Sequence, residues 1–251
     1  MLDVTHRGDI AVLMMTHGKA NALDTELCRH IAKRLEELGT SSARAVILTG
    51  RGKIFSAGVD LLRVLDGGAA YLRDFLPTLR KLFDVVFFYH KPIVAAVNGH
   101  AIAGGCVLAC AADKRLMARG PGRIGVTELL VGLAFPAIAL EIMRFVAASH
   151  HFEEIIFSGA TYPPEAAGPR GLIDASVEQD ALMERAMAAA QALAALSPAA
   201  FALSKSHSRQ PVLNRLQTDG PAIDKAVDEV WLSSESTARV RDYVTRTFKK
   251  I

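Results

Sequence analysis

The sequence predicts an α/β protein with a mostly parallel sheet and a helical C-terminal region, and three observations support this class. Short buried strands alternate with helical patterns in the first half of the chain. Short glycine-containing turns join them, which favours right-handed crossovers between parallel strands. After about residue 135 the strand signal nearly vanishes. A chain of 251 residues, 51% of them hydrophobic, can bury a full core of this kind.

The first predicted unit is a strand followed by a helix. Residues 10–16 form an apolar run, which is typical of a buried strand. In residues 23–38 leucine and isoleucine recur every three or four positions, as they do on one face of a helix. Asp24 stands where its carboxylate can cap the first turn of that helix.

The order of strand, glycine turn and helix then recurs twice. The first repeat comprises a strand over residues 45–48, the turn Thr49-Gly-Arg-Gly52, a helical pattern through Leu65 and a long helix over residues 69–88. The second comprises a strand over residues 93–97, the turn Asn98-Gly99 and a helix over residues 103–109.

The remainder of the chain is predicted to be mainly helical. Only residues 172–177 are a late strand candidate. The expected helices cover residues 181–196, a segment restarted at Ser197-Pro198, and residues 221–248. We therefore expect a core domain over residues 1–195 and a C-terminal helical region over residues 196–251.

Composition and charge argue against several classes of protein. The net charge is only +3 and the basic residues are scattered, so no nucleic-acid-binding stripe is visible. Cys28, Cys106 and Cys110 lack the spacing of a disulfide framework or a zinc site, which fits a reducing, cytoplasmic compartment. The N-terminus lacks the pattern of a signal peptide, and the most apolar stretch, residues 101–112, is too short to span a bilayer.

Two segments place glycines where a strand ends and a helix begins, namely Phe55-Ser-Ala-Gly-Val-Asp60 and Ala103-Gly-Gly-Cys106. Helix N-termini offer unpaired backbone N–H groups and the positive end of the helix dipole. Together the two segments can converge on one small oxyanion. Taken alone, each is more typical of an ordinary structural turn.

The order of these segments along the chain resembles the crotonase (enoyl-CoA hydratase/isomerase) superfamily. Besides those two, the matching segments are Asn21-Ala-Leu23, Val46-Ile-Leu-Thr-Gly50, Lys91-Pro-Ile-Val-Ala-Ala-Val-Asn-Gly99, Cys110-Ala-Ala-Asp113 and Gly171-Leu-Ile-Asp174. The resemblance implies the crotonase (ClpP/crotonase-like) fold, a spiral of ββα turns. It also implies a homotrimer or a hexamer, with residues 196–251 as the trimerisation region, and an acyl-CoA thioester as substrate.

The resemblance also implies the catalytic groups. The backbone N–H groups of Val59 and Gly104 are the expected oxyanion-hole donors, which would hold the thioester oxygen. Glu128 occupies the position of the second of two glutamates that hydratases of the family use, whereas Val107 occupies the first. Because valine cannot transfer a proton, two-carboxylate hydration should be impaired. One base suffices to move a double bond, so a single-glutamate pattern resembles the mitochondrial-type Δ3,Δ2-enoyl-CoA isomerases, and residues 233–248 resemble theirs too.

The sequence leaves alternatives open both for the role of Glu128 and for the activity of the protein. A glutamate at a helix start is often a surface carboxylate, but the apolar neighbours of Glu128 favour a desolvated carboxylate with a raised pKa. The chain could instead be an enoyl-CoA hydratase, a catalytically idle acyl-CoA-binding homologue, or a crotonase with another acyl chemistry such as thioester hydrolysis or decarboxylation.

Contacts to coenzyme A are likewise implied by the resemblance. The Ala57 carbonyl is expected to meet the adenine, and Tyr243 and Arg246 on the last helix are expected to hold CoA across a subunit boundary. Leu62 replaces a lysine of the family, which leaves Arg63 as a possible phosphate contact. No metal and no separate cofactor is expected, since CoA is part of the substrate. Asp60 is expected to hold the oxyanion loop and cap a helix.

Overall fold

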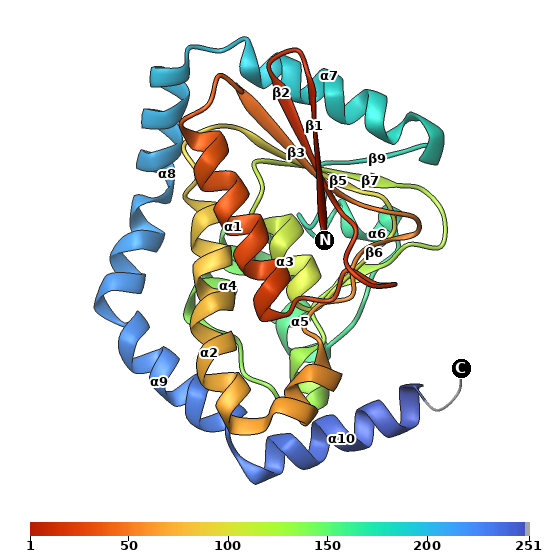
Figure 1. Cartoon of the computed structure of the whole chain (residues 1–251), viewed down its shortest axis with the longest axis vertical. Helices are drawn as coiled ribbons and strands as arrows, with labels where there is room; N and C mark the ends of the chain where they lie inside the picture. The colour runs from red at the N-terminus through yellow and green to blue at the C-terminus, as the bar shows by residue number, and fades with distance from the viewer. Residues whose placement is uncertain (249–251) are drawn as a thin grey trace.

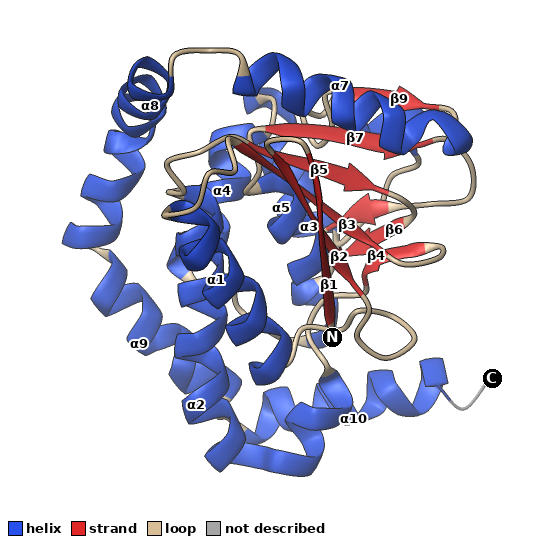
Figure 2. Ribbon diagram, turned by 45° about the horizontal axis from the view of Figure 1, so that its top comes forward, coloured by secondary structure: helices blue, strands red, loops and turns tan. Residues whose placement is uncertain are grey.

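The computed structural model describes residues 1–248, and its main feature is a twisted sheet with helices on both faces (Figures 1 and 2). Helix α7 (Leu182–Ala194) covers one face of the sheet, as Figure 2 shows. The other face carries most of the remaining helices. The α/β class and the helical C-terminal region are thus confirmed.

The larger sheet has six strands in the order β1-β2-β3-β5-β7-β9. Their bounds are β1 (Leu2–Arg7), β2 (Ile10–Met15), β3 (Ala45–Gly50), β5 (Ile93–Val97), β7 (Lys114–Ala118) and β9 (Ala175–Val177). All neighbours pair in parallel except β1 with β2, which form an antiparallel hairpin at one edge. The central strands β3 and β5 are buried along their whole length, because helices cover both of their faces.

A second, three-stranded parallel sheet was not predicted. It comprises β4 (Ile54–Ser56), β6 (His100–Ile102) and β8 (Ile124–Gly125), in that order. Strands of two or three residues are too short to show a period in the sequence. This sheet nevertheless positions the candidate site, because each strand leads directly into one of its segments.

The helices on the main core face are α1 (Thr25–Gly39), α2 (Leu61–Phe87), α3 (Gly104–Cys110), α4 (Ala137–Val146), α5 (Phe152–Ser158) and α6 (Pro164–Ala167). The predicted caps are confirmed: Asp24 accepts a hydrogen bond from the Leu27 N–H, and Asp60 accepts one from the Arg63 N–H. Helix α2 is kinked at Gly68, whose φ of 54° and ψ of −147° are not helical. The kink lies between the two helical segments that the sequence predicts.

Three helices, α8 (Pro198–Thr218), α9 (Gly220–Trp231) and α10 (Ser234–Phe248), complete the described chain. Figure 1 shows α8 and α9 running along one side of the body and α10 crossing its end. Residues 249–251 of the predicted C-terminal region lie outside the described residues. Within residues 1–248, no single helix is long and apolar enough to cross a membrane; only the bent pair 179–194 and 198–218 passes that test together.

Two strand predictions need correction. The hairpin strand β1 was missed, because its side chains are largely exposed and give no apolar run. The late strand begins at Ala175 rather than at residue 172, because Leu172 and Ile173 are buried in the turn that precedes it.

Candidate active site

The two glycine-containing turns that the sequence singles out lie against each other. Gly58 follows β4 and has a φ of 82°, and a Cβ on it would lie 2.6 Å from the Ile102 carbonyl oxygen. A Cβ on Gly105 would lie 2.4 Å from the Ser56 carbonyl oxygen. Backbone therefore meets backbone at both positions, which only glycine permits.

The contact brings together two free backbone donors. The N–H groups of Val59 and Gly104 have no acceptor within residues 1–248, although neighbouring amides do, such as Asp60, which donates to the Leu23 carbonyl at 3.0 Å. The Gly104 nitrogen would lie 3.2 Å from a Cβ on Gly58. Helix α3 starts here from Ala103, whose φ of 52° is unusual for a residue other than glycine. Strain of this kind marks a turn held in place by its surroundings, and the two donors suit an oxyanion.

Asn21 and Ser56 hold the first of these turns in place, and no role was predicted for either residue from the sequence. The Asn21 side-chain amide donates to the carbonyls of Ile54 and Phe55 at 3.2 and 3.1 Å. The Ser56 hydroxyl donates to the Asn21 carbonyl at 2.7 Å and accepts from the Gly58 N–H at 3.2 Å. Both residues belong to segments that carry the family resemblance, which was the available signal.

Glu128 lies next to this pair of turns in the fold. It follows β8, which pairs with β6, and the Ala103 N–H donates to the Gly125 carbonyl at 2.8 Å. Glu128 starts the short 3-10 helix η1 (Glu128–Val131) and is only 8% exposed. The expectation of a desolvated carboxylate is confirmed, and the surface alternative is wrong.

The surroundings of Glu128 favour its protonated form. Burial raises the pKa of Glu128 to about 7, although the backbone N–H groups of Glu128 and Thr127 partly oppose the shift. Its Oε2 is buried and has no hydrogen-bond partner among the described residues. An unsatisfied carboxylate oxygen with a pKa near neutrality is suited to accept and return a proton.

The neighbouring helix α3 adds no second acid to the site. Val107 is fully buried, as are Cys106 and Cys110, whose thiols are free. Contact with the Cys110 thiol and burial raise the pKa of the Cys106 thiol, and the charge of Glu128 adds to the shift. The cysteines therefore act as small buried side chains. Nowhere in residues 1–248 do three or more His, Cys, Asp or Glu side chains form a metal-binding group.

The residues expected to contact CoA lie on different elements of the fold. Ala57 is exposed in the turn that follows β4. Tyr243 packs against the core from α10, and Arg246 on the same helix is 71% exposed and pairs with Asp242. Arg63 pairs with Glu26 at 2.7 Å, so its guanidinium already has a partner.

Comparisons with known proteins agree on one family. A sequence model described as enoyl-CoA hydratase/isomerase matches residues 5–242. A putative enoyl-CoA hydratase of Thermus thermophilus is 33% identical over 204 residues, which cover 79% of this chain and 80% of that protein. The human mitochondrial enoyl-CoA delta isomerase 1 is 28% identical over 216 residues, covering 85% of this chain and 72% of the relative.

A solved structure shares the fold over almost the whole chain. The crystal structure of human mitochondrial delta3-delta2-enoyl-CoA isomerase superposes with a TM-score of 0.94 at 25% identity. The match covers 99% of this chain and 98% of that one. The spiral architecture and the helical C-terminal region of this chain are therefore those of a known fold.

Proposed function

Since the chain belongs to the enoyl-CoA hydratase/isomerase family of the crotonase superfamily, we propose that it is a Δ3,Δ2-enoyl-CoA isomerase that works through Glu128. The observation that carries the proposal is a single buried carboxylate beside two free N–H donors, with Val107 where a second acid would stand. This arrangement supplies one proton carrier and one anion site, which is what a double-bond shift requires.

The proposed reaction has two proton transfers. Glu128 as carboxylate removes a proton from C2 of a 3-enoyl thioester, and the electron pair moves through C1 onto the thioester oxygen. The N–H groups of Val59 and Gly104 donate hydrogen bonds to the resulting dienolate oxygen. Protonated Glu128 then returns the proton to C4, which leaves the double bond between C2 and C3. A pKa of about 7 suits a group that must both accept and release a proton.

Hydration is the second candidate, because relatives at 33–35% identity carry the name enoyl-CoA hydratase. Water addition needs a water molecule that is positioned and deprotonated on one face of the double bond. Val107 offers no hydrogen bond for that purpose. We therefore rank hydration below isomerisation for this chain.

The deciding experiment compares two substrates with three proteins: wild type, Glu128→Gln, and Glu165→Gln as an exposed glutamate control. Conjugation of trans-3-hexenoyl-CoA is followed by the absorbance of the enoyl thioester, and water addition to crotonyl-CoA by mass spectrometry. We expect isomerisation by the wild type and the control, its loss in Glu128→Gln, and little hydration. Strong hydration by the wild type would favour the hydratase. Binding of both esters without turnover would favour an idle acyl-CoA binder or another acyl chemistry.

The pH dependence offers a separate test of the base. Because Glu128 must be ionised to remove the first proton, kcat/KM for isomerisation should rise with pH through an apparent pKa of about 7 and then level off. A rate that does not change between about pH 5 and 8 would exclude Glu128 as that base.

The remaining parts of the proposal concern CoA and assembly. We keep the Ala57 carbonyl as adenine contact, with Tyr243 and Arg246 supplied to a neighbouring subunit within a homotrimer or a hexamer. The free thiols of all three cysteines suit the predicted cytoplasmic compartment. No cofactor beyond the CoA of the substrate enters the proposed reaction.

A further inference from the structure

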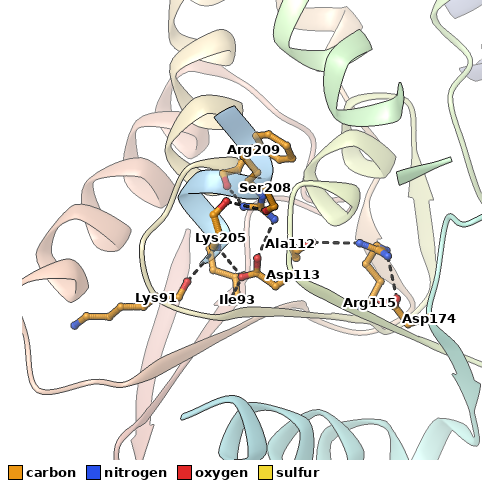
Figure 3. A network of polar contacts seen from close by, with 10 residues as sticks. Lys91, Ile93, Ala112, Asp113, Arg115, Asp174, Lys205, Ser208 and Arg209 are labelled. Carbon is orange, nitrogen blue, oxygen red and sulfur yellow. Dashed lines mark hydrogen bonds and ion pairs between the residues drawn. The ribbon is translucent and has the colours of Figure 1, made fainter. Parts of the chain in front are cut away.

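A buried cluster of charged side chains joins helix α8 to the larger sheet (Figure 3). None of these side chains takes part in the proposed reaction. Asp113 lies at the amino end of β7 and accepts hydrogen bonds from Lys205 at 2.7 Å and from Arg209 at 2.8 Å. The three side chains are 12%, 6% and 5% exposed, respectively. The cluster sits at the amino ends of β5 and β7, whereas the turns that carry Val59 and Gly104 follow β4 and β6.

The charges in this cluster do not balance. One carboxylate, that of Asp113, contacts two buried cations. The nearby Arg115 does not change the net charge of the cluster, because it forms an ion pair with Asp174 at 3.0 Å. One positive charge therefore remains without a counterion. Burial lowers the pKa of Lys205 to about 8, as expected for a buried cation that is incompletely compensated.

A cavity of about 490 Å³ adjoins the unbalanced charge. Its lining includes Asp113, Arg115, Ser204, Lys205, Ser208 and Arg209, and Asp113 is the only acid among its lining residues. The Lys205 ammonium uses two of its three N–H groups, on Asp113 and on the Lys91 carbonyl. The Arg115 Nε is buried without an acceptor in the described part of the chain. Unused donors and excess positive charge thus occur together.

We propose that this cavity binds a phosphate group, whose negative charge compensates the Lys205–Arg209 pair. A tetrahedral oxyanion has enough acceptor oxygens for the third N–H group of Lys205 and for the Ser204 hydroxyl, and the cavity has room for it. The group belongs either to inorganic phosphate or to a phosphate ester such as CoA. Bound phosphate would stabilise the contact between α8 and the amino ends of β5 and β7.

The test uses two substitutions of one kind on one helix. Ser204→Glu places a carboxylate among the lining residues of the cavity, where it supplies the missing negative charge itself. Ser206→Glu adds the same charge at an exposed position that does not line the cavity. Thermal unfolding of the wild type and both variants is measured while inorganic phosphate replaces chloride at constant ionic strength, with circular dichroism to verify that each variant is folded.

We expect phosphate to raise the melting temperature of the wild type and of Ser206→Glu in a saturable way. Ser204→Glu should melt higher than Ser206→Glu without phosphate and should bind phosphate at least about tenfold more weakly. Equal responses in the two variants, or no difference between phosphate and chloride in the wild type, would overturn the proposal.

The source of the phosphate follows from a third titration, with CoA in place of phosphate. If CoA protects the wild type and Ser204→Glu equally while inorganic phosphate protects only the wild type, the cavity takes free phosphate. If Ser204→Glu also loses part of the protection by CoA, the cavity takes a phosphate ester. Neither result depends on isomerase activity, so the proposed function can fail while this site stands.

Discussion

At the scale of single residues, the burial that suits Glu128 to its proposed role in proton transfer also lowers the stability of the fold. A carboxylate with a buried, unpartnered oxygen is costly to ionise, as its pKa of about 7 reflects. Because Glu128 ionises readily in the unfolded chain but only with difficulty in the folded one, it lowers the stability of the protein at every pH above about 4.5, and the loss grows until the pH reaches about 7. Removing the charge should therefore stabilise the fold.

Glu128→Gln is expected to raise the free energy of unfolding at pH 8 by about 1–3 kcal/mol, since a pKa of about 7 in place of 4.5 corresponds to about 3 kcal/mol. The sign follows from linkage: the folded state binds the proton more tightly, so the wild type loses stability as pH rises from about 4.5 to about 7. Urea unfolding of both proteins at pH 4 and pH 8 measures the difference.

At pH 4 the carboxyl group is protonated in both states, so most of the gain from Glu128→Gln should be absent there. Glu165→Gln, an exposed control, should show no such pH dependence. A gain that is equal at both pH values would mean that the amide stabilises by shape or hydrogen bonding, and that Glu128 is not ionised with difficulty.

The sequence contained the identity of Glu128 and of its apolar neighbours, but the burial of its Oε2 depends on packing from several elements. Likewise, Asn21 stood within a motif, yet its amide meets the carbonyls of Ile54 and Phe55 only because β4 folds back beside it. Hydrogen bonds between residues more than thirty positions apart cannot be derived from local spacing.

At the scale of elements, the site depends on two turns that approach within backbone contact. Gly58→Ala should lower kcat at least about hundredfold, because a Cβ would lie 2.6 Å from the Ile102 carbonyl and push the Val59 and Gly104 donors apart. The measurement is the isomerase assay together with the melting temperature.

Gly52→Ala is the matched control for that substitution. Gly52 also has a positive φ, 72°, but a Cβ there would meet nothing within 4 Å. It should cost about 1 kcal/mol of stability from backbone strain and leave kcat within about twofold. Equal losses of kcat in the two variants would mean that general strain, and not the approach of the two turns, governs activity.

Helix α8 offers a second prediction at this scale. Asp113→Asn should destabilise the protein by about 3–5 kcal/mol, because it leaves Lys205 and Arg209 buried without their carboxylate. Asp74→Asn removes an exposed partner of Arg29 and should cost less than about 1 kcal/mol. Chemical unfolding compares the two, and similar small losses would show that the buried cluster contributes little to stability.

Elements with a long apolar pattern were predictable, and short or exposed ones were not. The kink in α2 was visible as a gap between two helical segments, because Gly67-Gly68 interrupts the apolar period. The strands β4, β6 and β8 were invisible, since they are held by pairing with one another and not by a hydrophobic period of their own.

At the scale of the whole molecule, assembly is the open prediction. We expect light scattering to give three or six times the chain mass of 26.9 kDa. The expected CoA contacts Tyr243 and Arg246 lie on α10, which Figure 1 shows crossing the end of the molecule. A monomer at assay concentrations that is fully active would contradict both the assembly and the role of these residues.

Complementation tests whether CoA is held across subunits. Glu128→Gln and the double variant Tyr243→Ala/Arg246→Ala should each have low activity alone. After the two are unfolded together and refolded in equal amounts, random trimers should contain about one quarter of sites with all groups intact, so activity should reappear. Refolding each variant separately before mixing is the control, and no gain over it would place the CoA contacts within one chain.

The α/β class, the alternation of core strands and helices, and the family could all be predicted from the sequence alone, because they depend on apolar periodicity and on motifs contiguous in the chain. Tertiary packing was needed to show that the turns carrying Val59 and Gly104 lie in backbone contact, that Glu128 is buried, and that Asp113 pairs with two cations on a helix more than ninety residues later. The physical reason is that desolvation and charge balance are properties of the packed environment, to which distant segments contribute, whereas periodicity is a property of neighbours along the chain.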